Sequence, residues 1–290
     1  MTERGETLSI GAAAPDLPPP AQARLRARLR KAGDVALFAL GAGLLAWAIY
    51  AGAQAMGYNW QWSRVPRGFY RVVEGELIWG PLARGLVVTL QITLAAIPLA
   101  LAIGLATALL RLSRSFAGHA LATFYLEIVR NTPLLVQMYL FYFVLAPILG
   151  IDRFWTGVLC LAVFEASFIS EIIRGGVLAV PRGQWEGAAA LGLRPAQLWR
   201  KVVLPQAAPL MAPPMTSAVV NLIKNSAIVS TIAVFDLANE ARNMIADTFL
   251  SFEIWLVVAA VYLCLTIPLS AVAGWLERRS NRNRRAAAPG

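Results

Sequence analysis

Charged residues are scarce in this chain of 290 residues. They make up 14% of it, whereas hydrophobic residues make up 58%. A typical soluble domain has about 25% charged residues. The 26 basic and 16 acidic residues are clustered and leave long uncharged runs between them. This distribution argues against a soluble globular protein and is typical of an integral membrane protein. The net charge of +10 does not indicate a nucleic-acid-binding protein, because the basic residues flank apolar runs.

Metal-binding and catalytic residue patterns are also missing. The chain has one histidine, His119, and two cysteines, Cys160 and Cys264, which lie far apart inside apolar runs. We therefore expect neither a disulfide framework nor a metal site, and no cofactor in this chain. No lysine follows a glycine, so the GxxxxGK[ST] phosphate-binding loop is absent and the chain cannot be its own P-loop ATPase. No Ser/His/Asp or paired-carboxylate pattern indicates an enzyme.

Long apolar runs predict an all-α integral membrane protein. A run of 22 residues rises about 33 Å as a helix, which is enough to cross a bilayer. None of the runs alternates polar and apolar residues, so transmembrane strands are not expected. We predict six transmembrane helices, at about 35–56, 86–110, 122–149, 155–180, 209–234 and 254–276.

The basic residues predict the orientation of these spans. Eighteen Lys and Arg residues fall on the side that holds both termini, and five fall on the other side. The positive-inside rule then places both termini in the cytoplasm. We expect segment 1–34 to be disordered and cytoplasmic, 35–56 to be an extra first transmembrane helix, and 280–290 to be a basic cytoplasmic tail. The external loop 57–83 is rich in Trp and Tyr, which favours an interfacial helix.

The most informative segment is the hydrophilic cytoplasmic loop 181–205. Residues 184–191 can form a short helix, and Gly192 is suited to a left-handed cap at its end. Pro195 suits the first turn of a second helix, and we expect Pro205 to end that helix. The loop could be an ordinary helix–turn–helix connector.

The surface of the first helix suggests another use. Ala188 and Ala190 make it thin, so that it could approach another protein closely. Glu186 lies near its N-terminus, where a carboxylate interacts favourably with the helix dipole.

Several ionisable residues lie within or beside the apolar runs. Two pairs spaced i,i+3, Glu127 with Arg130 and Glu171 with Arg174, are predicted to be structural ion pairs. Glu165 lies about midway along its run with no charge one turn away, and an uncompensated carboxylate there costs about 2.5–3.5 kcal/mol. We expect Glu165 to face the bundle interior. It could contact a substrate ammonium group, or it could be protonated or paired with Lys224.

The loop resembles the EAA loop of bacterial ABC-importer permeases. In that family Glu-Ala-Ala is followed by three residues, Gly, nine residues, Ile, any residue and Leu-Pro. This sequence has Glu186, Gly187 in place of the first Ala, Gly192, and Val202 in place of Ile, followed by Leu204 and Pro205. The spacing is the same throughout.

Other segments of the sequence, within about residues 80–279, are similar to the polar amino-acid branch of that family. They are 85–93, 111–113, 127–137, which includes Gln137, and 171–176. Lys224, Asn225 and Ser226 stand where relatives often have Lys-Asp-Thr/Ser, so any role built on that Asp is in doubt.

The resemblance implies a division of labour among several proteins. It implies a type I importer permease core at about 84–279, whose loop 181–205 couples it to a cytoplasmic ABC ATPase dimer that binds ATP and Mg. It also implies a second permease subunit, an extracytoplasmic amino-acid-binding protein, and a place in the bacterial inner membrane. The substrate path would include Glu165, Gln137 and Lys224–Ser226. An ion-coupled secondary transporter and a membrane anchor for an enzyme complex are the competing functions.

Overall fold

The computed structural model describes residues 21–287. The chain divides into two compact units, one that ends at Trp60 and one that begins at Gln61. The first unit is formed by helix α1, Ala21–Ala55. Its segment Arg30–Ala55 has a mean hydropathy of 1.9 and is long enough to cross a membrane, as predicted for 35–56. The prediction of disorder over 1–34 is wrong for 21–34, where Ala, Leu and Arg favour a helix, and residues 1–20 lie outside the described part.

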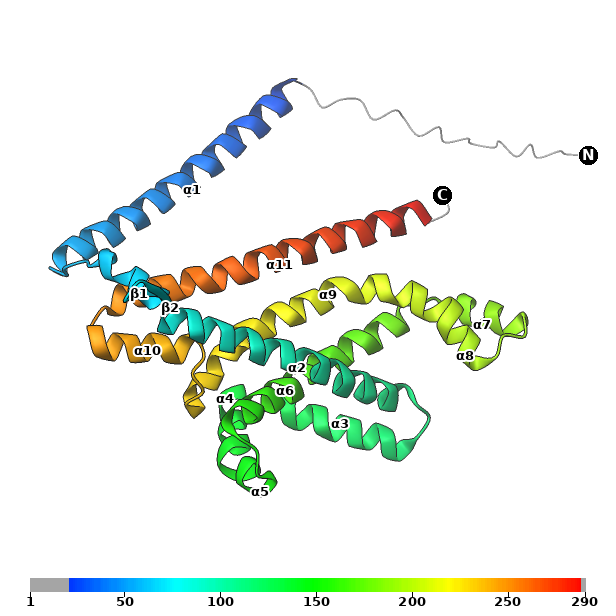
Figure 1. The fold of residues 1–290 in the computed structure, drawn as a ribbon. Helices are drawn as coiled ribbons and strands as arrows, with labels where there is room; N and C mark the ends of the chain where they lie inside the picture. Colours follow the sequence, from blue (N-terminus) through cyan, green and yellow to red (C-terminus); the bar gives the residue numbers. More distant parts are fainter. Residues whose placement is uncertain (1–20, 288–290) are drawn as a thin grey trace, which may run out of the picture. The chain divides into compact units, whose positions relative to one another are not determined.

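Four long helices form the framework of the second unit (Figure 1). They are α2 (Pro81–Leu112), α6 (Arg153–Leu178), α9 (Leu204–Asn225) and α11 (Ser251–Ala287). α2 packs along α6 through small residues on one face, among them Ala96, Ala100 and Gly104. A Cβ atom at Gly104 would lie 2.6 Å from the Ile169 side chain, so the close approach of the two helices needs glycine there. The bundle core therefore depends on small residues as well as large ones.

The third apolar run is bent and does not form one straight span. Helix α3 (Phe116–Asn131) is followed by α4 (Leu134–Leu140), the π-helical turn η2 (Phe141–Leu145) and α5 (Ala146–Leu149). The axis changes by 109° between α3 and α4. Proline disfavours the helical conformation of the residue before it, and the break falls at Thr132 and Pro133.

The fifth apolar run also continues through a bend. α9 is followed by the 3-10 helix η4 (Ser226–Ile232) and then by α10 (Leu237–Thr248), with a bend of 51°. Four single helices are long and apolar enough to cross a membrane: α1, α2, α6 and α11. If each of the two bent pairs is counted as one further span, the total is the predicted six.

The segment 57–83, predicted to be external, differs from the expected interfacial helix. The expected interfacial helix is a seven-residue 3-10 helix, η1 (Trp62–Gly68), followed by an antiparallel hairpin of β1 (Tyr70–Val73) and β2 (Glu76–Trp79). Glu74 and Gly75 form its turn with positive φ angles of 54° and 83°. A Glu-Gly pair between β-branched and aromatic residues is a weak hairpin signal that the sequence does contain.

Candidate coupling loop and translocation cavity

Loop 181–205 begins with helix α7, Arg182–Ala190, close to the predicted 184–191. Gly192 has a φ angle of +71°, which confirms the left-handed cap. The amide of Gly192 donates to the carbonyl of Ala189 at 2.9 Å, and that of Leu193 donates to Ala188 at 3.3 Å. These two bonds form a Schellman motif, which satisfies the last carbonyls of the helix and reverses the chain.

A second helical segment joins the loop to the membrane. Helix α8 (Pro195–Leu198) begins at Pro195, as predicted, and continues through the π-helical turn η3 (Trp199–Val203) into α9. The prediction that Pro205 ends this helix is wrong. The amide of Leu204 donates to the carbonyl of Trp199, five residues earlier. This wider turn accommodates a proline that lacks an N–H group.

The loop is fixed to the ends of α6 and α9 by its own core. Val177 and Val180 at the end of α6 pack with Val203, the last residue of η3, and with Ala207 in the first turn of α9. The rings of Trp185 and Trp199 meet edge to face at 5.4 Å between centroids, which ties α7 to η3. Gln206 donates a hydrogen bond to the Gln184 side chain at 3.2 Å. These contacts attach α7 to the neighbouring ends of α6 and α9.

The outer face of α7 is open. Glu186, Gly187 and Ala190 are exposed, and Leu191 at its end is 82% exposed. Ala188 is only 5% exposed, so the interpretation that it faces a partner is wrong, because its position on the helix faces the chain itself. Leu204 and Pro205 are also exposed, at the start of α9.

One of the two predicted ion pairs exists. Glu171 accepts a hydrogen bond from Arg174 at 2.7 Å, and it also pairs with Arg111 on α2. Within residues 21–287 Glu127 and Arg130 form no ion pair, so that prediction is wrong. Glu127 accepts from the Asn131 side chain at 2.9 Å, and the Arg130 guanidinium lies over the Phe168 ring at 5.3 Å from its centroid.

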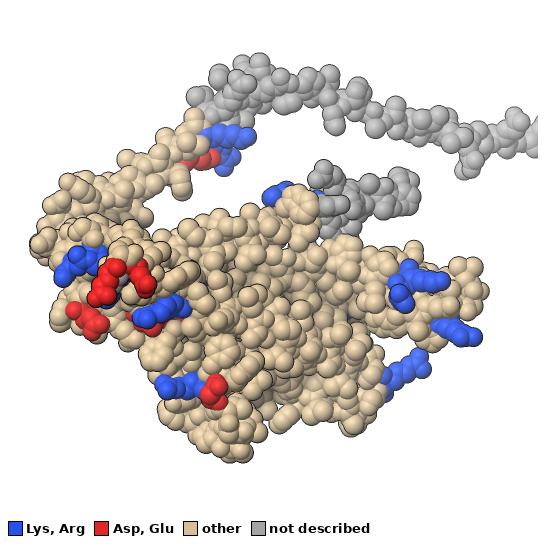
Figure 2. Space-filling view, in the orientation of Figure 1, with Lys and Arg blue, Asp and Glu red and all other residues tan. Residues whose placement is uncertain are grey.

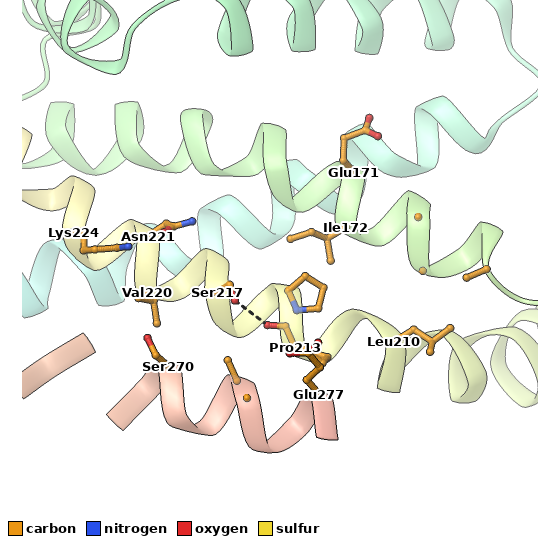
Figure 3. A pocket seen from close by; sticks show the side chains of 16 residues that line it. Glu171, Ile172, Leu210, Pro213, Ser217, Val220, Asn221, Lys224, Ser270 and Glu277 are labelled. Atoms are coloured by element: carbon orange, nitrogen blue, oxygen red, sulfur yellow. Dashed lines mark hydrogen bonds between the residues drawn. The ribbon is translucent and has the colours of Figure 1, made fainter. Parts of the chain in front are cut away.

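A cavity of about 960 Å³ lies between α6, α9 and α11 (Figure 3). Its charged lining residues are Glu171, Lys224 and Glu277. Figure 3 shows that the Glu171 carboxylate points away from α9 and α11, so Lys224 and Glu277 remain as the charges available inside the cavity. Apolar walls with a few polar groups are typical of small-molecule sites.

Sequence reasoning missed most of the polar lining of this cavity. Ser217, Asn221 and Lys224 on α9 line it together with Ser270 and Glu277 on α11. The spacing of the three α9 residues, i, i+4 and i+7, places them on one helix face. This polar stripe in an apolar run is the signal that could have found the cavity wall.

Glu165 lies in a different place from Lys224. It is 3% exposed and lines a separate, mostly apolar cavity of about 310 Å³ beside Ile97, Met215 and Leu222. The burial prediction is confirmed, but Glu165 has no ion pair with Lys224 in the described part of the chain.

The other predicted path residues have local partners of their own. Gln137 is buried and donates to the carbonyls of Val129 and Thr132 at 2.7 and 2.9 Å, across the bend between α3 and α4. Ser226 is buried and bonds the carbonyl of Ile223 at 2.7 Å, and Asn225 is half-buried. None of these residues is among those that line the cavity of Glu165, and the substrate path stays a prediction.

Comparison with known proteins identifies related chains. Residues 96–282 match the family "Binding-protein-dependent transport system inner membrane component". The probable glutamine ABC transporter permease protein GlnM of Bacillus subtilis (strain 168) is 35% identical over 67% of this chain and 91% of its own. The octopine transport system permease protein OccM of Rhizobium radiobacter is 32% identical over 69% and 89%.

Solved structures agree with this relationship. A structure described as "Crystal structure of an amino acid ABC transporter with histidines" is 35% identical, with a TM-score of 0.63, and the match covers 69% of this chain and 94% of that one. The inward-facing MetNI methionine ABC transporter, at 22% identity and a TM-score of 0.57, shares the fold. The family match and the close relatives together show that the chain belongs to the multi-pass inner membrane components of binding-protein-dependent transport systems.

Proposed function

We propose that this chain is the permease subunit of an amino-acid ABC importer, and that loop 181–205 couples it to a partner ATPase. The relatives named above are permeases for glutamine and octopine, and another is the arginine transport system permease protein ArtQ of Bacillus subtilis. Partners would be a cytoplasmic ATPase dimer that binds ATP and Mg, a second permease subunit, and an extracytoplasmic binding protein.

One structural observation carries this proposal. The two helices that hold the loop, α6 and α9, also line the large cavity. The loop has an exposed face on α7 and a rigid attachment made by Trp185, Trp199 and the valines around them. A closing ATPase that moves α7 would move both cavity walls. The proposal requires such a mechanical connection between α7 and the cavity walls.

The charges in the cavity suit an amino acid in transit. A zwitterion has a carboxylate and an ammonium group, and Lys224 and Glu277 offer one charge of each sign on different helices. Glu165 remains a candidate contact for the ammonium group through its own cavity, as the sequence suggests.

The proposed orientation places α7 and α8 in the cytoplasm. In Figure 2 their end of the molecule carries basic side chains, and the surface of the bundle between the two ends is nearly free of charge. Basic loops favour the cytoplasmic side. Cysteines introduced at 280–290 should react with a membrane-impermeant reagent only after the membrane is opened. Labelling from outside would refute the orientation.

Co-purification and ATPase assays in proteoliposomes test the function. The full chain should carry an ABC ATPase with it, and ATP turnover should rise when the binding protein is supplied with its amino acid. A panel of amino acids then identifies the substrate. Uptake that needs an ion gradient and no ATPase would instead support a secondary transporter, and no uptake with an enzyme complex attached would support a membrane anchor.

A further inference from the structure

A second pocket, lined by three arginines, lies at the opposite end of the second unit from α7 and α8. η1 supplies Arg64 and Arg67, β1 supplies Arg71, and the last turn of α10 supplies Met244 and Thr248. The pocket has a volume of about 520 Å³. Its arginines precede the region that matches the transporter family, which begins at residue 96, whereas Met244 and Thr248 lie within that region. The pocket shares no lining residue with the cavity between α6, α9 and α11.

Within the described residues 21–287, none of the three arginines forms an ion pair. Arg64 donates to the Gln61 side chain at 2.9 Å, and Arg71 donates weakly to the Arg67 carbonyl at 3.4 Å. No carboxylate lines the pocket. Glu240 and Asp247 on α10 line a neighbouring pocket that Arg71 also lines. Arg64 and Arg67 line only the pocket without acids.

The position of the arginines is unusual for a membrane protein. They are three of only five basic residues that the sequence assigns to the external side. Such residues are rare there because basic residues favour the cytoplasmic side. Their concentration around one pocket indicates a local anionic ligand.

The surroundings of the pocket are those of a membrane boundary. The spans of α2 and α11 begin at this end, at Pro81 and Ser251. The hairpin next to the pocket exposes Val72, Leu77 and Trp79, each more than 60% accessible. Aromatic and apolar side chains beside basic ones are typical of segments that lie in the headgroup region of a bilayer.

The hairpin is held firmly in this position. The amide of Gly80 donates to the Phe69 carbonyl at 2.8 Å. A Cβ atom at Gly80 would lie 2.3 Å from the carbonyl oxygen of Gly68, so only glycine allows η1 and the start of α2 to approach this closely. The pocket is thus preformed and does not depend on a mobile loop.

We propose that this pocket binds the phosphate of an anionic phospholipid in the outer leaflet of the membrane. One guanidinium group can donate two parallel hydrogen bonds to two oxygens of the same phosphate, which a lysine ammonium group cannot do. The acyl chains would lie along Val72, Leu77 and Trp79. An acidic protein surface would satisfy the arginines but would leave these apolar side chains in water. The arginines of the pocket and the apolar side chains of the hairpin therefore both favour a lipid.

Lipid titration of the purified full chain in neutral detergent tests this proposal. Native mass spectrometry should detect a bound phosphatidylglycerol but no phosphatidylcholine at the same concentration. Each Arg→Gln change at 64, 67 or 71 should weaken binding about fivefold, and the triple change about a hundredfold. Arg67→Lys should bind less tightly than the wild type although it keeps the charge.

Arg153→Gln is the matched control. Arg153 is also external and exposed, and it bonds the Ala233 carbonyl at 3.2 Å, away from the pocket. Removal of its charge should leave lipid binding unchanged. Arg67→Gln keeps the test valid if the triple variant fails to fold, because no hydrogen bond of the Arg67 side chain is found in the described part of the chain.

Three results would overturn the proposal. Equal losses with Arg67→Gln and Arg153→Gln would mean that only net charge matters. Competition by inorganic phosphate at the same concentration as the lipid would mean a site for soluble anions. Occupation of the pocket only when the external binding protein is present would mean a protein-docking face.

Discussion

Gly192→Val tests the coupling loop most directly. At a φ angle of +71°, a residue with a Cβ atom is strained by about 1–2 kcal/mol, and a β-branched residue is worse. A Cβ atom at Gly192 would meet nothing within 4 Å. The whole effect therefore comes from the backbone, and no steric clash contributes.

The strain sets the expected size of the effect. If α7 docks only in the observed conformation, 1–2 kcal/mol reduces the fraction of loops in that conformation about 5- to 30-fold. Loss of the Schellman bonds to Ala188 and Ala189 would add about 0.5–1.5 kcal/mol each. We expect at least tenfold weaker ATPase binding. Substrate-stimulated ATP turnover should be lost while membrane insertion remains.

The assay is a pull-down with the partner ATPase, followed by turnover in proteoliposomes. Gly192→Asn should retain most docking, because asparagine tolerates the left-handed region. Gly150→Val is the strain-matched control, since Gly150 has a φ angle of +66° and equally open space but lies between α5 and α6. Docking that is equally weak in both valine variants, or normal in Gly192→Val, would refute the proposed role of this turn.

Further predictions concern four other positions. Ala190→Trp, on the exposed face of α7, should weaken ATPase pull-down without lowering the melting temperature, whereas Ala188→Trp should destabilise the loop itself by about 1–3 kcal/mol; the opposite pattern would contradict the assigned helix face. Glu165→Gln should reduce amino-acid uptake but leave ATPase pull-down intact, and normal uptake across pH would make it a bystander. Gln137→Leu should lower the free energy of unfolding by about 1–3 kcal/mol, because two carbonyls at the α3–α4 bend lose their hydrogen-bond donor. An unchanged melting temperature would show that these two hydrogen bonds do not stabilise the bend.

The predictions that held depend on local features. The apolar runs agree with four helices that are long enough to span a membrane, or six if each bent pair counts as one span, because crossing a bilayer requires a fixed length of apolar helix. Gly192 and Pro195 marked the turn and the second helix of the loop, because their backbone preferences act within one or two residues. The prediction that Pro205 ends a helix failed because the π-helical turn η3 before it lets the helix continue. The prediction of an interfacial helix at 57–83 failed because β1 and β2 pair there as a hairpin.

The sequence by itself thus determined the membrane class, the turn of the loop and the family to which the chain is similar. Only the tertiary structure decided which side chains meet. Glu171 pairs with Arg111, sixty residues away, and Gln137 closes a bend that no periodicity reveals. Lys224 and Glu277 share a cavity although they lie on different helices. Such partners are selected by how helices pack and bend, and packing depends on close approaches between distant segments, which local residue patterns do not encode.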